Sequence, residues 1–242
     1  MTRLFHISDI HFGLEDRRAL DWVAQCIARE KPDAVSITGD LTMRARHREY
    51  AAAVDWIKSL NVPVTVEVGN HDLPYFNLIE RFIDPYRRFD AIQSLIEREI
   101  DLPGVAIVPL KTTARAQWRL NWSKGRVGNR DLDEALSDLE RHRARPLKLV
   151  TCHHPLVDAD TEGSGSTRGG KRALAALARA GADAVLSGHV HDPFDLMVEA
   201  DGFPIRLIGA GTLSQRLRAT RPSYNRLEWS AEGGLKVCQR TA

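Results

Sequence analysis

The chain has 242 residues, of which 43% are hydrophobic and 27% charged, an ordinary balance for a globular protein. Its 34 basic and 32 acidic residues leave a formal charge of +2, which argues against a dedicated nucleic-acid binder, because such proteins normally carry a marked basic excess. No apolar run reaches the roughly 20 residues that a membrane-spanning helix needs, so membrane insertion is not expected.

The cysteines indicate the compartment. There are three of them, widely spaced and without a Cys-x-x-Cys pair, so neither a disulfide framework nor a zinc finger is indicated. Cys26 and Cys152 fall in apolar patterns and are expected to be buried thiols in a reducing compartment. The apolar part of residues 1–8 is too short for a signal peptide, and we therefore expect a cytoplasmic protein.

In chain order, short apolar runs alternate with amphipathic helical stretches, and after residue 187 only strand-like runs remain. The predicted strands are 3–8, 34–38, 64–68, 105–110, 117–122, 147–152, 184–187, 194–199, 205–209, 223–229 and 235–238. The predicted helices are 17–30, 47–60, 75–100 with a break at Pro85, a helix capped by Asn129 or Asp131 that runs to about 142, and 171–180.

The domain organisation follows from this order. No linker separates the β/α part from the strand-rich tail, so we predict one α/β domain over residues 1–242 with two packed sheets. Residues 73–100 are predicted to be a helical, cap-like insertion, which either covers the functional site or contacts a partner chain.

Five clusters of potential metal ligands follow predicted strands, at or just beyond their C-terminal ends. They are Asp9-Ile10-His11, Gly39-Asp40, Gly69-Asn70-His71-Asp72, His153-His154-Pro155 and Gly188-His189-Val190-His191. Loops at the C-terminal ends of strands are where α/β proteins usually build sites. Each cluster alone has an ordinary structural explanation, such as a turn or a buried, hydrogen-bonded histidine. Their joint occurrence in this order argues against a purely structural explanation for all five.

Two of these clusters contain paired histidines. Side chains alternate in an extended segment, so His189 and His191 are expected on one face, which favours shared ligation. His154 precedes Pro155, which restricts it to extended geometry and is expected to point it away from His153. We therefore prefer His153 as the ligand and keep His154 as the alternative.

Three side chains outside the clusters complete the set of candidates. Residues 206–226 include five arginines and no acid, so this stretch is either a solvated loop or attracts an anionic substrate. Arg216 in this stretch and Arg168 are candidate substrate contacts, and a surface role stays equally open for each. His6 lies in the first predicted strand and is expected to be buried and hydrogen-bonded.

The ordered series of clusters resembles the calcineurin-like metallophosphoesterase superfamily. Three longer strings are similar to its class III cyclic nucleotide phosphodiesterase branch: Gly39-Asp40-Leu41-Thr42, His153-His154-Pro155 and Gly211-Thr212. The resemblance implies a four-layer αββα sandwich, in which helices flank two mixed central β-sheets.

The resemblance also implies a role for each candidate. One metal ion would be held by Asp9, His11 and His191. The other would be held by Asn70, His153 and His189. Asp40 would bridge both ions, and His71 would face the substrate phosphate beside Asn70 without ligating, so that Asp40 and His71 are the expected catalytic residues.

The chemistry of these residues agrees with such a centre. Oxygen and imidazole ligands without thiolate suit iron and manganese, which we expect here, and also zinc or cobalt. Two divalent ions less the charges of Asp9 and Asp40 leave roughly +2 in the pocket, which a phosphate ester matches. Shared coordination would provide a bridging hydroxide near neutral pH, and His71 would stabilise or protonate the departing alkoxide.

We therefore predict a dinuclear-metal-dependent phosphodiesterase, with a 3',5'-cyclic nucleotide as the first candidate substrate. The alternatives among enzymes are a glycerophosphodiester or phospholipid head group and a nucleotide pyrophosphate, whereas the near-neutral charge argues against a nucleic-acid end. A non-catalytic binding module with the same fold is the alternative from a different class. Loss of a ligand or of His71 would favour it, and neither is seen. The expected partner is a small phosphate ester, and a homodimer stays open.

Overall fold

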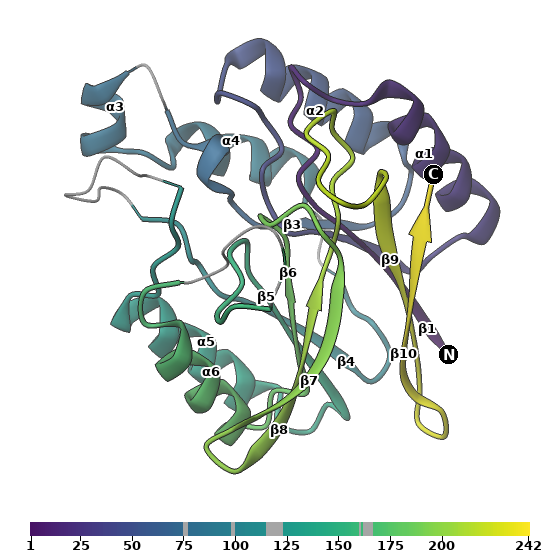
Figure 1. Ribbon diagram of the computed structural model, residues 1–242, viewed down its shortest axis with the longest axis vertical. Helices are drawn as coiled ribbons and strands as arrows, with labels where there is room; N and C mark the ends of the chain where they lie inside the picture. Colours follow the sequence, from purple (N-terminus) through teal and green to yellow (C-terminus); the bar gives the residue numbers. More distant parts are fainter. Residues whose placement is uncertain (75–76, 98–99, 115–122, 160, 162–166) are drawn as a thin grey trace.

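The computed structural model describes residues 1–74, 77–97, 100–114, 123–159, 161 and 167–242 (Figure 1). Its helices are α1 (Arg17–Glu30), α2 (His47–Ser59), the short 3₁₀ turn η1 (Asn70–Asp72), α3 (Leu78–Ile83), α4 (Arg87–Ile96), α5 (Asn129–Arg141) and α6 (Gly170–Arg179). Its strands are β1 (Thr2–Ile7), β2 (Ala34–Ile37), β3 (Val64–Val66), β4 (Val105–Pro109), β5 (Leu147–Thr151), β6 (Ala184–Ser187), β7 (Phe194–Ala200), β8 (Phe203–Gly209), β9 (Ser223–Ser230) and β10 (Gly234–Thr241).

The strands form two mixed sheets. The first has the order β10-β9-β1-β2-β3, in which β1, β2 and β3 are parallel to one another and β9 runs antiparallel to both of its neighbours, β1 and β10. The second has the order β4-β5-β6-β8-β7, in which only β7 is antiparallel. Because the central strands of each sheet are parallel, their C-terminal ends share one edge, and the loops that follow them meet there.

Helices cover the outer face of each sheet, as Figure 1 shows, with α1, α2 and α4 on one side and α5 and α6 on the other. Alternation along β1 explains the layering, because Phe5 and Ile7 pack toward the helices while Leu4 packs between the sheets. Leu149 and Ile208 reach the same inner layer from the second sheet. The predicted four-layer αββα sandwich is therefore confirmed.

Most of the predicted elements are present, with shifted boundaries. The stripe of Leu20, Val23 and Ile27 on α1 is buried, and Asp16 caps this helix by accepting from the backbone N–H groups of residues 18 and 19. The N-cap of α5 is Gly128, so the prediction of Asn129 or Asp131 as the cap was wrong by one position or more. The predicted strand 117–122 lies outside the described residues.

The predicted helical stretch 75–100 is divided as expected, because α3 ends before Pro85 and α4 begins after it. Phe89 and Ile96 of α4 join the core formed by α1, α2 and the first sheet. Just after α4, Glu97 accepts from the backbone N–H of Val66, so its side chain occupies the free edge of β3. Within the described residues, no helix combines the length and the apolar character needed to cross a bilayer.

Candidate metal centre

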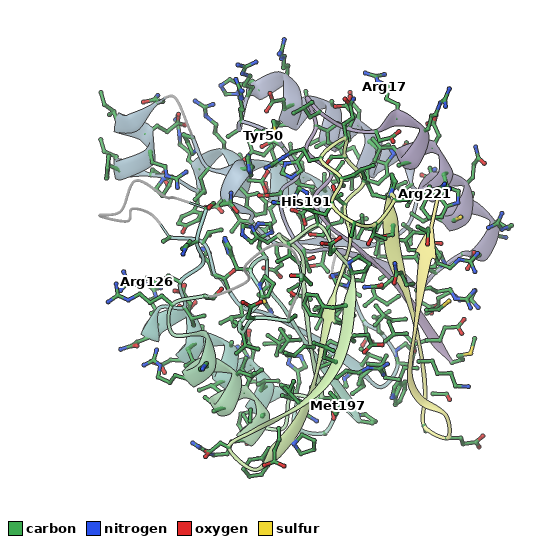
Figure 2. The ribbon with its side chains drawn as sticks, viewed as in Figure 1. Arg17, Tyr50, Arg126, His191, Met197 and Arg221 are labelled. Atoms are coloured by element: carbon green, nitrogen blue, oxygen red, sulfur yellow. The ribbon has the colours of Figure 1, made fainter. Side chains whose placement is uncertain are left out.

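All five clusters lie just beyond the C-terminal ends of parallel strands. Asp9 and His11 follow β1, Asp40 follows β2 and Asn70 follows β3, in the first sheet. The second sheet contributes His153 after β5 and the pair His189 and His191 after β6. His191 lies near the centre of the molecule in Figure 2, between parts of the chain that belong to the two sheets.

The first group consists of Asp9, His11 and His191. His191 Nδ1 donates to the carbonyl oxygen of Arg216 at 2.7 Å, which leaves its Nε2 facing inward. This Nε2 lies 3.2 Å from His11 Nε2 and 3.1 Å from Asp9 Oδ1. Asp9 Oδ1 is buried without a hydrogen-bond partner among the described residues. Potential acceptor atoms from three side chains therefore converge, an arrangement that a cation satisfies.

The second group consists of Asn70, His153 and His189. His153 Nδ1 donates to the carbonyl oxygen of Thr38 at 2.8 Å, so its Nε2 faces the group and lies 3.1 Å from Asn70 Oδ1. His189 packs edge-on to His153, with 5.1 Å between the ring centroids. The backbone carbonyl fixes the tautomer of His153 in the way that is typical of metal-binding histidines.

Asp40 lies between the two groups. Its Oδ1 accepts from the backbone N–H of His71 at 2.8 Å. Its Oδ2 lies 3.4 Å from His153 Nε2 and 3.7 Å from His11 Nε2, one nitrogen from each group. A single oxygen facing both groups supports the bridging role, which stays a prediction.

Strained backbone is concentrated at these positions. Nine non-glycine residues of the described chain have a positive φ. Five of them are Asp9 (φ 55°), His11 (52°), Asp40 (53°), His189 (71°) and His191 (64°). The left-handed region is unfavourable for residues with a Cβ, and such strain persists where the surrounding fold imposes it, often at functional sites.

This backbone corrects the prediction for the histidine pair. His189 and His191 are not in an extended segment, so the period-two argument does not apply to them. Two left-handed residues with Val190 between them turn one imidazole toward His153 and the other toward Asp9. The two histidines therefore serve different groups of the same centre.

The reason for preferring His153 over His154 was wrong, and the preference itself stays a prediction. The His154 ring does not point away from His153, because the two rings meet edge to face with centroids 4.6 Å apart. Both nitrogens of His154 are already hydrogen-bonded, Nδ1 to Thr112 Oγ1 and Nε2 to the carbonyl oxygen of Ser123, each at 3.0 Å. His153 has an inward-facing Nε2, which supports it as the ligand.

The two carboxylates and His11 differ in how their surroundings shift their pKa values. Burial opposes ionisation of Asp40, but His153 and His71 outweigh burial and hold the pKa of Asp40 well below its ordinary value. Burial also opposes ionisation of Asp9, and His191 keeps the pKa of Asp9 low. Burial lowers the pKa of His11 to about 3, so this imidazole is neutral, as a ligand must be.

His71 and Arg216 lie together at the open side of the centre. His71 Nδ1 donates to the carbonyl oxygen of Met43 at 2.8 Å, which turns its Nε2 toward the guanidinium of Arg216, 3.1 Å from Nη1. The same Nη1 lies 3.5 Å from His11 Nε2. The structure thus brings Arg216 to the predicted ligands. Arg168 is exposed, and its side chain has no hydrogen bond to a ligand residue within the described part of the chain.

Comparison with known proteins identifies the family. Residues 2–193 match the model of the calcineurin-like phosphoesterases. The chain belongs to this family. The family implies metal-dependent hydrolysis of phosphoric esters at a dinuclear metal centre, for which this chain has candidate ligands.

Two curated relatives match parts of this phosphoesterase. The DNA double-strand break repair protein Mre11 of Aeropyrum pernix is 29% identical over 116 residues, which are 42% of this chain and 26% of the relative. The glycerophosphodiester phosphodiesterase GpdQ of Enterobacter lignolyticus is 32% identical over 80 residues, which are 28% of this chain and 29% of the relative. The matches thus span less than a third of the length of either relative.

Solved structures share the fold at low identity. A dimetal phosphatase of Danio rerio superposes with a TM-score of 0.68 at 12% identity, over 98% of both chains. A purple acid phosphatase from yellow lupin superposes with a TM-score of 0.70 at 14% identity, over 99% of this chain and 51% of the other. These likenesses establish the sandwich fold of the phosphoesterase.

The residues present fit two metal ions. Besides the unpartnered Asp9 Oδ1, the Nδ1 of His11 is buried without a hydrogen-bond partner in the described residues. Candidate ligand atoms lie within 4.8 Å of one another in several overlapping groups, among them Asp9, His11 and His191 and also Asp9, Asp40 and His153. The donor set has only imidazole and oxygen atoms, which suits iron, manganese, zinc and cobalt alike.

The structure also gives a role to residues of the quoted strings to which the sequence patterns assigned none. Thr212 is fully buried, and its hydroxyl donates to the carbonyl oxygen of Asp9 at 2.6 Å and accepts from the backbone N–H of Ser214 at 3.0 Å. Ser214 Oγ in turn accepts from the backbone N–H of Arg216. The string Gly211-Thr212 pointed to this position in the sequence, but only the contacts in the structure show that Thr212 positions the backbone of Asp9 and, through Ser214, that of Arg216.

Asp72 is a second residue of this kind. Its buried carboxylate accepts from the backbone N–H groups of Leu41, Thr42 and Gly69, and so clamps the loop of Asp40 to the loop of Asn70. Burial, and next the charge of Asp40, raise the pKa of Asp72 to about 7.

Close approach explains two of the glycines. A Cβ on Gly69 would lie 2.1 Å from the backbone nitrogen of Asp40, and a Cβ on Gly188 would lie 1.8 Å from Ser8 Oγ. Both positions join loops of different strands beside the ligands, where a larger residue would force them apart.

Proposed function

We propose that this phosphoesterase hydrolyses a phosphodiester, and that a 3',5'-cyclic nucleotide is its first candidate substrate. The observation that carries the proposal is the position of Asp40 Oδ2, which faces one inward nitrogen from each ligand group. A pair of ions held in this way supplies charge stabilisation and an activated water molecule for attack on phosphorus.

We propose the same ligand roles that the sequence resemblance implies. Asp9, His11 and His191 hold one ion, while Asn70, His153 and His189 hold the other, with iron and/or manganese as the proposed metals. The inward-facing nitrogens of His11, His153 and His191 support this division. We also propose a cytoplasmic location and a homodimer.

His71 is proposed to act on the leaving group. Its Nδ1 proton is held by the carbonyl oxygen of Met43, so only Nε2 faces the site. Nε2 can donate to a departing alkoxide only when the imidazole carries both protons. His71 is therefore a general acid in its imidazolium form, and in its neutral form it accepts from a cationic or hydroxyl donor.

A glycerophosphodiester is the second candidate substrate. The 32% identity with a protein named a glycerophosphodiester phosphodiesterase supports it, although only 80 residues are shared. The near-neutral charge of the chain argues against long nucleic-acid substrates, whatever the name of the other relative.

The test is a substrate panel with the manganese-loaded protein. The panel contains bis-p-nitrophenyl phosphate, cyclic AMP, glycerophosphocholine and a dinucleotide pyrophosphate, each measured with and without chelator. We expect diester hydrolysis that chelator abolishes, with cyclic AMP the best natural compound. Full turnover in chelator would overturn the metal-dependent proposal, and preference for the pyrophosphate would overturn the diester.

A variant separates the role of His71 from assembly of the centre. His71→Ala should keep its metal content and lose turnover by roughly 10²- to 10⁴-fold on an alkyl diester. The loss should be smaller on bis-p-nitrophenyl phosphate, because p-nitrophenolate leaves without a proton. Loss of metal in parallel with rate would show that His71 is a ligand instead.

A further inference from the structure

We infer that His6 positions the candidate ligand His153 through Thr38, and thereby sets the affinity of the centre for the ion of the second group. The inference rests on the proposed dinuclear function and assigns a role to residues that touch neither the ions nor the substrate. Its starting observation is a buried polar network that runs from Asn225 on β9 through His6 and Thr38 to the His153 ring.

The strands place the members of this network in the layer between the sheets. Because side chains alternate along β1, His6 faces away from the helices that Phe5 and Ile7 pack against. Asn225 lies directly opposite His6 in the antiparallel pairing of β1 with β9. Thr38 is the first residue after β2. All three polar side chains are buried, so each of them needs a hydrogen-bond partner inside the protein.

The hydrogen bonds of His6 can run in only one direction. Asn225 Nδ2 donates to the carbonyl oxygen of Gly209 at 2.8 Å, which fixes the orientation of the amide, and the same nitrogen lies 3.4 Å from His6 Nδ1. Nδ1 of His6 is therefore an acceptor. Burial lowers the pKa of His6 to about 3, so the ring is neutral near neutral pH. Its one proton lies on Nε2, which donates to Thr38 Oγ1 at 3.0 Å.

Thr38 passes this restraint to the metal centre. Its side chain is held by His6, and its carbonyl oxygen accepts from His153 Nδ1 at 2.8 Å and from Ser8 Oγ at 3.2 Å. The His153 ring also lies against the next residue, because a Cβ on Gly39 would be 2.6 Å from His153 Nδ1. A rotation of the peptide group after Thr38 would therefore turn the imidazole that faces the second group.

The first ligand group depends on different contacts. His191 Nδ1 donates to the carbonyl oxygen of Arg216, and the carbonyl oxygen of Asp9 accepts from Thr212. Within the described residues, no side-chain hydrogen bond of His6 reaches this group. Loss of the contact between His6 and Thr38 should therefore weaken binding of the second ion and spare the first.

The test uses two amide side chains that differ only in reach. The amide nitrogen of glutamine can occupy the position of an imidazole Nε2, whereas that of asparagine reaches only the position of Nδ1. His6→Gln can therefore still donate to Thr38, and His6→Asn cannot. Ser36→Ala is the matched control, because Ser36 lies beside His6 in the register of β1 and β2 and its buried hydroxyl has no hydrogen-bond partner among the described residues.

Three measurements are made on each protein. Calorimetric titration with manganese gives the affinity of each site, and elemental analysis after dialysis gives the metal content. The electron paramagnetic resonance spectrum distinguishes a magnetically coupled pair of manganese ions from an isolated ion. Hydrolysis of bis-p-nitrophenyl phosphate is followed at limiting and at saturating manganese.

We expect His6→Asn to bind the first ion as tightly as the wild type and the second roughly 10- to 100-fold more weakly, as is typical when a contact that orients a ligand is lost. At limiting manganese its spectrum should be that of an isolated ion, and its low turnover should recover when manganese is saturating. His6→Gln should regain most of the affinity for the second ion, and Ser36→Ala should match the wild type.

Thr38→Val decides the question if His6→Asn does not fold. Valine keeps the shape of threonine and the backbone carbonyl but lacks the hydroxyl that His6 holds, so affinity for the second ion should fall by a similar factor.

Unchanged affinity for the second ion in His6→Asn, or in its substitute Thr38→Val, would overturn the inference. Equal weakening of both ions would also overturn it, and so would a loss in His6→Gln as large as that in His6→Asn, because His6 would then act only through packing. A wild type that binds both ions but hydrolyses no phosphodiester would refute the proposed function, while the manganese affinities would still decide the role of His6.

Discussion

Thr212→Val tests whether the fold holds the first ligand group through a single buried hydroxyl. Valine keeps the shape of threonine but removes the donor to the Asp9 carbonyl oxygen and the acceptor for the Ser214 N–H. It also removes the contact with Ser214 Oγ, which positions the backbone N–H of Arg216. Water cannot readily replace the lost hydrogen bonds, because Thr212 is fully buried.

The magnitude follows from these contacts. Loss of a net hydrogen bond costs about 0.5–1.5 kcal/mol, and a buried donor left without a partner costs about 1–3 kcal/mol. We therefore expect Thr212→Val to lower the free energy of unfolding by about 2–4 kcal/mol. The matched control is Thr212→Ser, which keeps the hydroxyl and deletes one buried methyl group, at a cost of about 1 kcal/mol.

The assay is urea unfolding of the metal-free proteins, followed by manganese titration of the folded ones. Loss of a contact that orients a ligand typically lowers metal affinity by about 10- to 100-fold, and we expect this for Thr212→Val but not for Thr212→Ser. If the Thr212→Val protein is as stable as Thr212→Ser and binds manganese as tightly, the hydroxyl does not hold Asp9 and the reasoning is refuted.

Three further predictions concern the centre and its surroundings. Asp40→Asn should weaken binding of both metals because the amide brings no charge, and two tightly held metals per chain after dialysis would show that Asp40 does not bridge. His153→Ala should lose one metal by elemental analysis while His154→Ala keeps both, and the reverse would exchange their assignments. Burial lowers the pKa of His6 to about 3. Between about pH 6.5 and pH 3, His6 is therefore protonated in the unfolded chain but not in the folded one. Stability of the metal-free protein should therefore fall from pH 6.5 toward 3, on the order of 5 kcal/mol from this group. His6→Gln should flatten that slope in urea titrations, and an unchanged slope would contradict the low pKa of His6.

The fold and the membership of the site were predictable from local patterns. Apolar runs followed by Asp9, Asp40 and His153 mark strand ends, and parallel strands bring their C-terminal ends to a common edge whatever the loops do. The buried, hydrogen-bonded state of His6 could also be predicted, because it lies in an apolar run, and the structure confirms it with Thr38 Oγ1 at 3.0 Å.

Contacts between distant segments were not predictable in this way. The orientation of the His154 ring depends on hydrogen bonds to Thr112 and Ser123, which lie 42 and 31 positions away in the sequence. A proline next to His154 restricts its backbone but does not choose the partners of its ring. In the same way, the role of Thr212 follows from its contact with the Asp9 carbonyl oxygen, 203 positions away.

The left-handed ligands explain why this centre needs two sheets. Each non-glycine residue in a sparsely populated region costs on the order of 1–3 kcal/mol, and five such residues lie in the three short loops that follow β1, β2 and β6. Rigid strands fix the ends of the loops, and bonds between them, such as His189 N–H to Asp9 Oδ2 at 2.7 Å, join one sheet to the other. The strain is thus held by the sandwich, and ligand geometry depends on the packing between the sheets as much as on the ligands themselves.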